Sequence, residues 1–157
     1  MHKTKTNAMR ILESMGFQYQ VYSYESSDGK IDGISVAEKI GKTPEQVYKT
    51  ILVKGMGREP YVFVLPVDAE LPLKKAAAIT GEKKLEMLPV KELLPWTGYM
   101  RGGCSPVGMK KKYKTYLDER ALLLDEVIVS AGKVGLQIGL APAALVRAVE
   151  ARVEKLG

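Results

Sequence analysis

The sequence predicts an α+β fold in which a mixed, mostly antiparallel sheet is flanked by helices. Three observations lead to this class. Short apolar runs typical of strands are interspersed with short amphipathic runs typical of helices. The order of these runs lacks a strict β–α–β rhythm, and two strand-like runs are apolar on both faces. The length of 157 residues, with 46% hydrophobic and 27% charged residues, fits one globular domain spanning 1–157.

The first third of the chain predicts a helix, a strand, a loop and two further helical segments. An apolar stripe ends at Gly16, and the aromatic, alternating run that follows favours a strand. Ser35 is expected to cap the next helix, which Gly41 ends. Thr43-Pro44-Glu45-Gln46 then combines an N-cap with a proline at the first helical position. The expected ranges are 4–15 (helix), 17–24 (strand), 26–33 (loop), 36–40 (helix) and 43–46 (helical turn).

The middle of the chain carries the two β-rich runs that are apolar on both faces, which predicts central strands. Gly55-Met56-Gly57-Arg58 between them predicts a hairpin connection. A helix closed by Gly81 and a short strand follow, and Pro95 is expected to break the next helical turn. The expected ranges are 49–53 and 61–67 (central strands), 73–80 (helix), 84–87 (strand) and 90–94 (helical turn).

The last third begins with a glycine- and proline-rich loop and ends with a predicted helix. Leu145, Val149, Val153 and Leu156 recur at helical spacing and form one apolar stripe. The expected ranges are 99–108 (loop), 114–117, 127–130 and 136–140 (strands) and 142–156 (helix).

Composition limits the location and the partners that we expect. No apolar run reaches the ~18 residues needed to cross a bilayer, and the first residues lack the pattern of a signal peptide. We therefore expect a soluble cytoplasmic protein that does not bind a membrane. The formal net charge of +6 favours a polyanionic partner such as nucleic acid, with simple solubility as the alternative explanation.

Residue types exclude several kinds of catalysis. The only histidine is His2, so a Ser-His-Asp or Cys-His mechanism lacks a base. Cys104 is the only cysteine and is expected to pack rather than to attack a substrate. One cysteine and one histidine do not complete a zinc site, so we expect no metal. The glycine-containing stretches at 55–60 and 127–134 do not fit a dinucleotide fingerprint or a Walker motif.

Three stretches carry a recognisable pattern: 46–53 (QVYKTILV), 98–111 (GYMRGGCSPVGMKK) and 129–138 (VSAGKVGLQI). In this order and at this spacing they resemble the YbaK/EbsC family, part of the superfamily of editing domains also inserted in bacterial prolyl-tRNA synthetases. The resemblance implies an α+β fold and the deacylation of mischarged aminoacyl-tRNA in trans, without metal or organic cofactor.

The resemblance also implies the substrate and the partners. Free-standing members of this type typically remove Cys from tRNA(Pro), often alongside prolyl-tRNA synthetase, whereas relatives in the superfamily remove Ala. Aminoacyl-tRNA and prolyl-tRNA synthetase are therefore the expected partners, with Cys-tRNA(Pro) or Ala-tRNA(Pro) as substrate. A module that binds aminoacyl-tRNA or the synthetase without chemistry is one alternative, and a general nucleic-acid binder suggested by charge is another.

Lys49 and Gly102 are the residues that the resemblance assigns to catalysis. Lys49 matches the lysine of the family's Tyr-Lys-Thr motif, and its ammonium would reach the terminal ribose, a phosphate or the ester carbonyl. A strand-end lysine that extends to solvent is the alternative. Gly102 and Gly103 leave backbone N–H groups unshielded, which favours contact with a carbonyl oxygen, and an ordinary turn is the alternative.

The residues expected to bind the substrate are Tyr24, Thr50, Gly103, Ser130, Gly132 and Gln137. The Ser130–Gly132 segment would bind the substrate amino group or the terminal adenosine, or form only a strand-end turn. Tyr24 would stack on the terminal base or serve as a core aromatic residue. Gln137 stands where the best-known Cys-specific members carry Asp, and an amide forms hydrogen bonds but no ion pair with an ammonium.

The nucleophile and the RNA contacts complete the expectation. A Cys substrate would attack its own ester through its thiolate and give a thiolactone, whereas an Ala substrate requires water. Lys110, Lys111 and Lys112 follow the glycine loop and are expected to neutralise acceptor-stem phosphates, with a solvated loop as the alternative.

Overall fold

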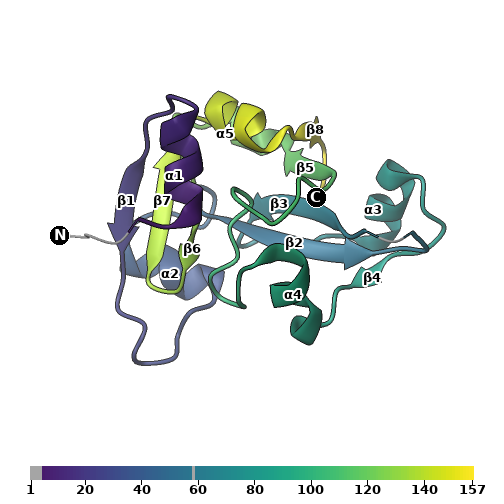
Figure 1. Cartoon of the computed structure of the whole chain (residues 1–157), viewed down its shortest axis with the longest axis horizontal. Coiled ribbons are helices and arrows are strands. Elements are labelled where there is room, and N and C mark those ends of the chain that lie inside the picture. The colour runs from purple at the N-terminus through teal and green to yellow at the C-terminus, as the bar shows by residue number, and fades with distance from the viewer. Residues whose placement is uncertain (1–4, 58) are drawn as a thin grey trace.

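The computed structural model describes residues 5–57 and 59–157 and confirms the α+β class. Its strands form two sheets, a small one on the left of Figure 1 and a larger one on the right. The small sheet is antiparallel throughout, and the larger one is antiparallel from β4 to β3 and parallel from β3 to β8. In spatial order, the strands are β1 (Gln20–Ser23), β7 (Leu136–Leu140) and β6 (Val127–Lys133) in the small sheet, and β4 (Glu86–Met87), β2 (Tyr48–Lys54), β3 (Tyr61–Pro66), β5 (Thr115–Asp118) and β8 (Arg152–Glu154) in the larger one.

The two sheets meet where β2 begins. An isolated parallel bridge joins Val47 to Ile128, and the Ile128 N–H donates to the Gln46 carbonyl at 3.0 Å. Val47 and Ile128 are buried with Val67 and Ala37, which comes from α2 (Gly33–Lys39). This small apolar cluster fixes the first residues of β2 against β6 and against α2.

Helices cover both faces of the sheets (Figure 1). The helices α1 and α5 place Leu12 and Leu145, both fully buried, in the core that includes β6 and β7. The helix α3 packs Ala76 and Ala77 against the other face of β2 and β3. The bounds are α1 (Asn7–Ser14), α3 (Leu73–Thr80), α4 (Val90–Thr97), α5 (Pro142–Val149) and the 3₁₀ helix η1 (Glu119–Leu123).

Most of the strands predicted from the sequence are confirmed. The two runs that are apolar on both faces form β2 and β3, which pair with each other through the predicted hairpin and lie inside the larger sheet. Arg58 of that hairpin, His2 and the first residue of the predicted 4–15 helix lie outside the described residues. Within the described part of the chain, no helix has the length and apolar character needed to cross a bilayer.

The prediction of one helix over 142–156 is wrong beyond Val149. Glu150 adopts a left-handed backbone with φ of 55°, which ends α5 and turns the chain back toward the sheet. Residues Arg152–Glu154 then form β8 beside β5. Leu156 is fully buried although it lies outside the helix. The spacing of apolar residues therefore indicated which residues are buried and not that they form a helix.

Two further helix boundaries differ from the prediction. The helix α4 continues through Pro95 to Thr97, because the Thr97 hydroxyl donates to the Leu93 carbonyl at 2.7 Å and Gly98 closes the last turn. The helix α2 begins before its predicted start at residue 36, because Asp32 rather than Ser35 is its N-cap. The Asp32 carboxylate accepts the Ser35 N–H at 3.1 Å, which satisfies a donor of the first turn.

Candidate active site

A cavity of about 150 Å³ lies where the two sheets meet. Five parts of the chain form its wall: the start of β2, the start of α2 with the loop before it, the residue after β3, the β6–β7 pair, and the loop between α4 and β5. The lining residues are Ile31, Gly33, Val36, Val47, Tyr48, Lys49, Thr50, Val67, Gly102, Cys104, Ser130 and Gln137. The structure therefore brings together five residues predicted from the sequence, namely Lys49, Thr50, Gly102, Ser130 and Gln137.

Lys49 is the cation of this cavity. Its ammonium forms no hydrogen bond or ion pair with another of the residues at 5–57 and 59–157. Burial lowers the pKa of its ammonium, and the negative charges of Glu70 and Asp68 act in the opposite direction. Its neighbours on the same side of β2, Ile51 and Val53, pack in the core with α3, so Lys49 reaches the cavity only because it stands at the strand end.

Three residues that line the cavity each carry a buried side-chain oxygen with no hydrogen-bond partner among the described residues. These oxygens are the Tyr48 hydroxyl, Thr50 Oγ1 and Gln137 Oε1. A buried polar atom without a partner costs about 1–3 kcal/mol, and such atoms often await a ligand. Burial also raises the pKa of the Tyr48 hydroxyl far above its ordinary value, so this group stays protonated.

Ser130 and Gln137 face each other across the β6–β7 pair and present a second polar wall. Ser130 Oγ accepts the N–H of Gly132 at 3.1 Å, which leaves the hydroxyl hydrogen free to donate toward the cavity. Gly132 itself does not line the cavity. It has φ of 98° in the irregular part of β6, and a Cβ there would lie 2.7 Å from the Tyr99 ring.

The glycine pair in the loop between α4 and β5 serves two different purposes. Gly102 borders the cavity with φ of 84°, and a Cβ there would lie 2.6 Å from Ile31 Cδ1. Gly103 is buried behind it, and its N–H donates to the Met100 carbonyl at 2.9 Å. The N–H of Gly103 is therefore committed within the loop, and Gly102 is the glycine of the pair that borders the cavity.

Cys104 lines the cavity as a protonated thiol. Burial raises its pKa to about 12, and a weaker effect from the Thr97 hydroxyl acts in the opposite direction. A thiol with this pKa is a poor nucleophile at neutral pH, which agrees with the packing role expected from the sequence.

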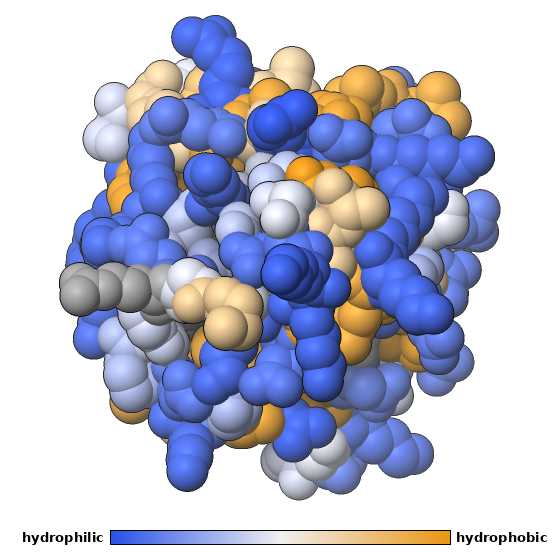
Figure 2. All heavy atoms as spheres, turned by 90° about the vertical axis from the view of Figure 1, so that its right-hand side faces the viewer, coloured by the Kyte–Doolittle hydropathy of each residue, from blue (hydrophilic) through white to orange (hydrophobic). Residues whose placement is uncertain are grey.

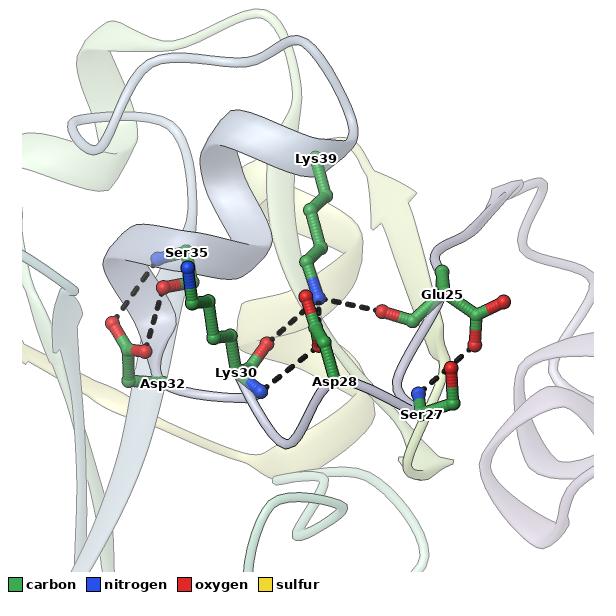
Figure 3. A network of polar contacts seen from close by, with 7 residues as sticks. All are labelled: Glu25, Ser27, Asp28, Lys30, Asp32, Ser35 and Lys39. Carbon is green, nitrogen blue, oxygen red and sulfur yellow. Dashed lines mark hydrogen bonds and ion pairs between the residues drawn. The ribbon is translucent and has the colours of Figure 1, made fainter.

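Lys39 holds together the loop that precedes α2 (Figure 3). Its ammonium donates to the Glu25 carbonyl at 2.6 Å, to Asp28 Oδ1 at 2.8 Å and to the Lys30 carbonyl at 3.0 Å. The hydrogen bond from Lys39 is the largest effect that lowers the pKa of the Asp28 carboxyl. Ile31 lies in the same loop and lines the cavity, so Lys39 holds part of the cavity rim in place. The sequence predicted only a polar loop for this segment.

Tyr24 lies at the start of this loop, just after β1, and not among the lining residues. Its ring centroid is 5.9 Å from Lys39 Nζ, and its hydroxyl is buried without a hydrogen-bond partner in the described part of the chain. Stacking of Tyr24 on a terminal base therefore remains a prediction.

The three lysines expected at the acceptor stem do not line the cavity. Lys111 forms an ion pair with Glu59, and Lys112 forms one with Glu150. Lys110 is exposed and anchors its backbone N–H on the Thr97 carbonyl at 3.1 Å. Any contact that they make with RNA is therefore separate from the cavity itself.

The cavity thus combines apolar side chains with the Lys49 ammonium, the polar groups of Ser130 and Gln137 and a glycine loop, within an α+β domain. Comparison with known proteins identifies the family. Residues 33–148 match the model of the aminoacyl-tRNA editing domain family, and the chain belongs to this family. The YbaK/EbsC resemblance predicted from the sequence is thereby confirmed.

Individual relatives agree with this assignment. The chain is 48% identical to the "Putative Cys-tRNA(Pro)/Cys-tRNA(Cys) deacylase EbsC" of Enterococcus faecalis, over 90% of this chain and 86% of that protein. It is 34% identical to the proline–tRNA ligase of Kosmotoga olearia, over 64% of this chain and 17% of the ligase. A crystal structure described as "a putative trans-editing enzyme for prolyl tRNA synthetase" superposes with a TM-score of 0.85 at 26% identity, covering 98% of both chains.

Proposed function

We propose that this protein removes the amino acid from mischarged tRNA in trans, with Cys-tRNA(Pro) as its principal substrate and Ala-tRNA(Pro) as the second candidate. The observation that carries the proposal is the convergence of Lys49, Gly102, Ser130 and Gln137 on one cavity. The names of the relatives support the same chemistry, since one is named for deacylating Cys-tRNA(Pro) and one is described as a trans-editing enzyme for prolyl tRNA synthetase.

The size of the cavity favours a small amino acid. A cavity of about 150 Å³ holds a group of roughly the size of benzene, so the aminoacyl part of a Cys or Ala ester fits. The terminal nucleoside is larger and would remain at the mouth. The ester bond would then lie near the rim, within reach of Lys49 and of the backbone at Gly102.

The cavity offers electrostatic stabilisation rather than a nucleophile of its own. The Lys49 ammonium and the backbone at Gly102 would stabilise the negative charge that develops on the carbonyl oxygen. Ser130, Thr50 and Gln137 would bind the substrate amino group. Because Gln137 is an amide, it would accept a hydrogen bond from this amino group without the charge of a carboxylate.

The attacking group would come from the substrate or from solvent. In Cys-tRNA(Pro) the substrate thiolate would form a bond to its own carbonyl carbon, and the ester C–O bond would break. The ribose oxygen would leave with a proton, giving a thiolactone and free tRNA. In Ala-tRNA(Pro) a water molecule would add to the carbonyl carbon and release alanine. Cys104 takes no part, because its thiol is protonated.

A deacylation panel tests the proposal. Purified protein should accelerate loss of Cys from Cys-tRNA(Pro), and Ala- and Ser-tRNA(Pro) measure its selectivity. Lys49→Ala should lose the acceleration, whereas Lys42→Ala, which removes a lysine outside the cavity lining, should retain it. If no mischarged tRNA(Pro) is deacylated faster than in buffer, the deacylase assignment fails. Tight binding of Cys-tRNA(Pro) without turnover would instead support a module that only binds aminoacyl-tRNA.

A further inference from the structure

A second hollow of the molecule lies away from the cavity, beside the hairpin that joins β2 and β3. It has a volume of about 560 Å³ and is lined by Glu59, Pro60, Tyr61, Trp96, Lys111 and Lys114, together with Gly57. We call it the Trp96 groove. An adjoining hollow of about 230 Å³ shares Gly57, Pro60 and Trp96 with it, so the surface is concave on both sides of these three residues.

Trp96 is held in a fixed orientation in this groove. Its ring packs edge-on against Tyr113 with centroids 6.0 Å apart, and the Tyr113 hydroxyl donates to the Trp96 carbonyl at 2.6 Å. The side chain is partly exposed, so one part of the indole is held in place by the protein and another part borders the groove. A rigid, partly exposed aromatic ring is the usual platform for stacking of a nucleic-acid base.

Cations line the same groove. Lys114 is exposed and forms no ion pair with another described residue. Lys111 is paired with Glu59, but an exposed pair of this kind contributes only about 0–1 kcal/mol, so a phosphate can replace the carboxylate at little cost. The surrounding end of the molecule, which carries α3, β4 and α4 and faces the viewer in Figure 2, is mainly hydrophilic with apolar side chains interspersed.

The groove and the cavity are connected by two elements. The loop between α4 and β5 lines the cavity with Gly102 and Cys104 and the groove with Lys111. The strand β2 begins at the cavity and spans about 20 Å at roughly 3.3 Å per residue before it ends beside the adjoining hollow. Stacked nucleotides advance about 3.4 Å each and an unstacked strand extends further per nucleotide, so this span takes at most about six nucleotides of RNA.

We infer that the Trp96 groove is a second RNA-binding site, in which a base stacks on Trp96 while phosphates contact Lys111 and Lys114. This inference rests on the proposed function, because it assumes that the ester at the end of the same RNA occupies the cavity. The nucleotide on Trp96 then belongs to the unpaired end of the acceptor arm, because a base in the paired stem is stacked between its neighbours and is not free to stack on Trp96. RNA is favoured over a protein partner as the occupant, because its phosphates would pair with the Lys114 cation, which has no ion-pair partner among the described residues.

Trp96 is the only tryptophan, so its fluorescence reports this groove directly. The probe is uncharged tRNA(Pro), which carries no ester and makes binding independent of deacylation. We expect RNA to change the Trp96 emission. Trp96→Ala, followed by the anisotropy of labelled tRNA, should weaken binding about 5- to 150-fold, and Trp96→Phe should restore most of it.

Lys114→Gln provides the charge test. It should lower the slope of log affinity against log salt by about 0.7–0.9, whereas Lys74→Gln, an exposed lysine on α3, should leave the slope unchanged. RNA binding with no change in Trp96 emission would overturn the inference, as would a change caused by prolyl-tRNA synthetase but not by RNA. Deacylation without a change in Trp96 fluorescence would refute only the RNA-binding role of the Trp96 groove. A fluorescence change without deacylation would refute only the proposed deacylase function.

Discussion

Replacing Lys49 with methionine should separate catalysis from stability. The variant keeps the aliphatic chain and removes the ammonium, so the β2 backbone and its pairing with β3 stay intact. Loss of one group that stabilises an oxyanion typically lowers the rate by about 10²–10³. At the same time the protein should become more stable, by about 0.5–2 kcal/mol, because the ammonium is partly buried without an ion pair.

The pH dependence of stability follows from the same group. Burial lowers the pKa of folded Lys49 below its ordinary value of 10.5. Between these two pKa values the unfolded chain binds more protons than the folded chain, so the free energy of unfolding contributed by Lys49 rises with pH. Below the folded pKa the full cost of the buried charge is present. Lys49→Met removes this cost and flattens the rise on the alkaline side.

Urea unfolding at neutral and alkaline pH measures the stability effect, and single-turnover deacylation of Cys-tRNA(Pro) measures the rate. Lys42→Met is the matched control. Lys42 Nζ lies 3.9 Å from Glu126 Oε1 and 5.3 Å from the Tyr22 ring centroid, so its loss should cost about 0.5 kcal/mol and leave turnover intact. If Lys49→Met lowered stability by more than about 1 kcal/mol and retained turnover, Lys49 would be a structural residue and the reasoning would be wrong.

Three other substitutions or reagents probe the cavity. Gly102→Ala should cost about 1–2 kcal/mol of stability and reduce turnover, because φ is 84° and the new Cβ would meet Ile31. Gly81→Ala, with φ of 80° and open space, has the backbone strain without the clash and should therefore show a smaller loss in urea unfolding and keep turnover. Lys39→Met removes three hydrogen bonds of the loop and should lower stability by about 1–3 kcal/mol, speed hydrogen exchange over 25–31 and raise KM. Slow hydrogen exchange in this variant would show that the cavity rim keeps its structure without Lys39. Cys104 should react with a disulfide reagent at pH 8 roughly 50- to 100-fold more slowly than a free thiol, and rapid reaction would contradict its raised pKa.

Local patterns in the sequence predicted the elements that depend on local interactions. The apolar runs of β2 and β3 identified central strands, because burial on both faces leaves no room for polar residues. The C-terminal segment was mispredicted because Val153 and Leu156 continue a helical spacing, although the residues after Glu150 pair with β5. A local stretch of sequence does not indicate pairing with a distant strand, and it is this tertiary pairing that makes the segment after Glu150 a strand.

Part of the cavity lining was predicted because family resemblance links residues that local patterns cannot connect. Lys49, Gly102 and Ser130 lie in three separate stretches of the sequence. Only the family resemblance indicated that they belong together, and in the structure they line one cavity. Lys39 was missed because two of its three hydrogen bonds go to backbone carbonyls, which every residue carries. Ile31 was missed as a lining residue because its position depends on a tertiary contact with Gly102, which the sequence of the polar loop does not indicate.

The basic stretch at 110–112 shows why closeness in sequence is a poor guide to closeness in space. Lys110 follows Gly102 by only a few residues, yet the loop leaves the cavity between them and continues toward the β2–β3 hairpin, where Lys111 pairs with Glu59. In the proposed mode of binding, the amino acid and the body of the RNA would therefore contact separate surfaces at the two ends of one loop. Loss of a groove lysine should then change affinity and salt dependence, whereas loss of Lys49 should change the rate of ester cleavage, and a single variant that changed both equally would argue against this division.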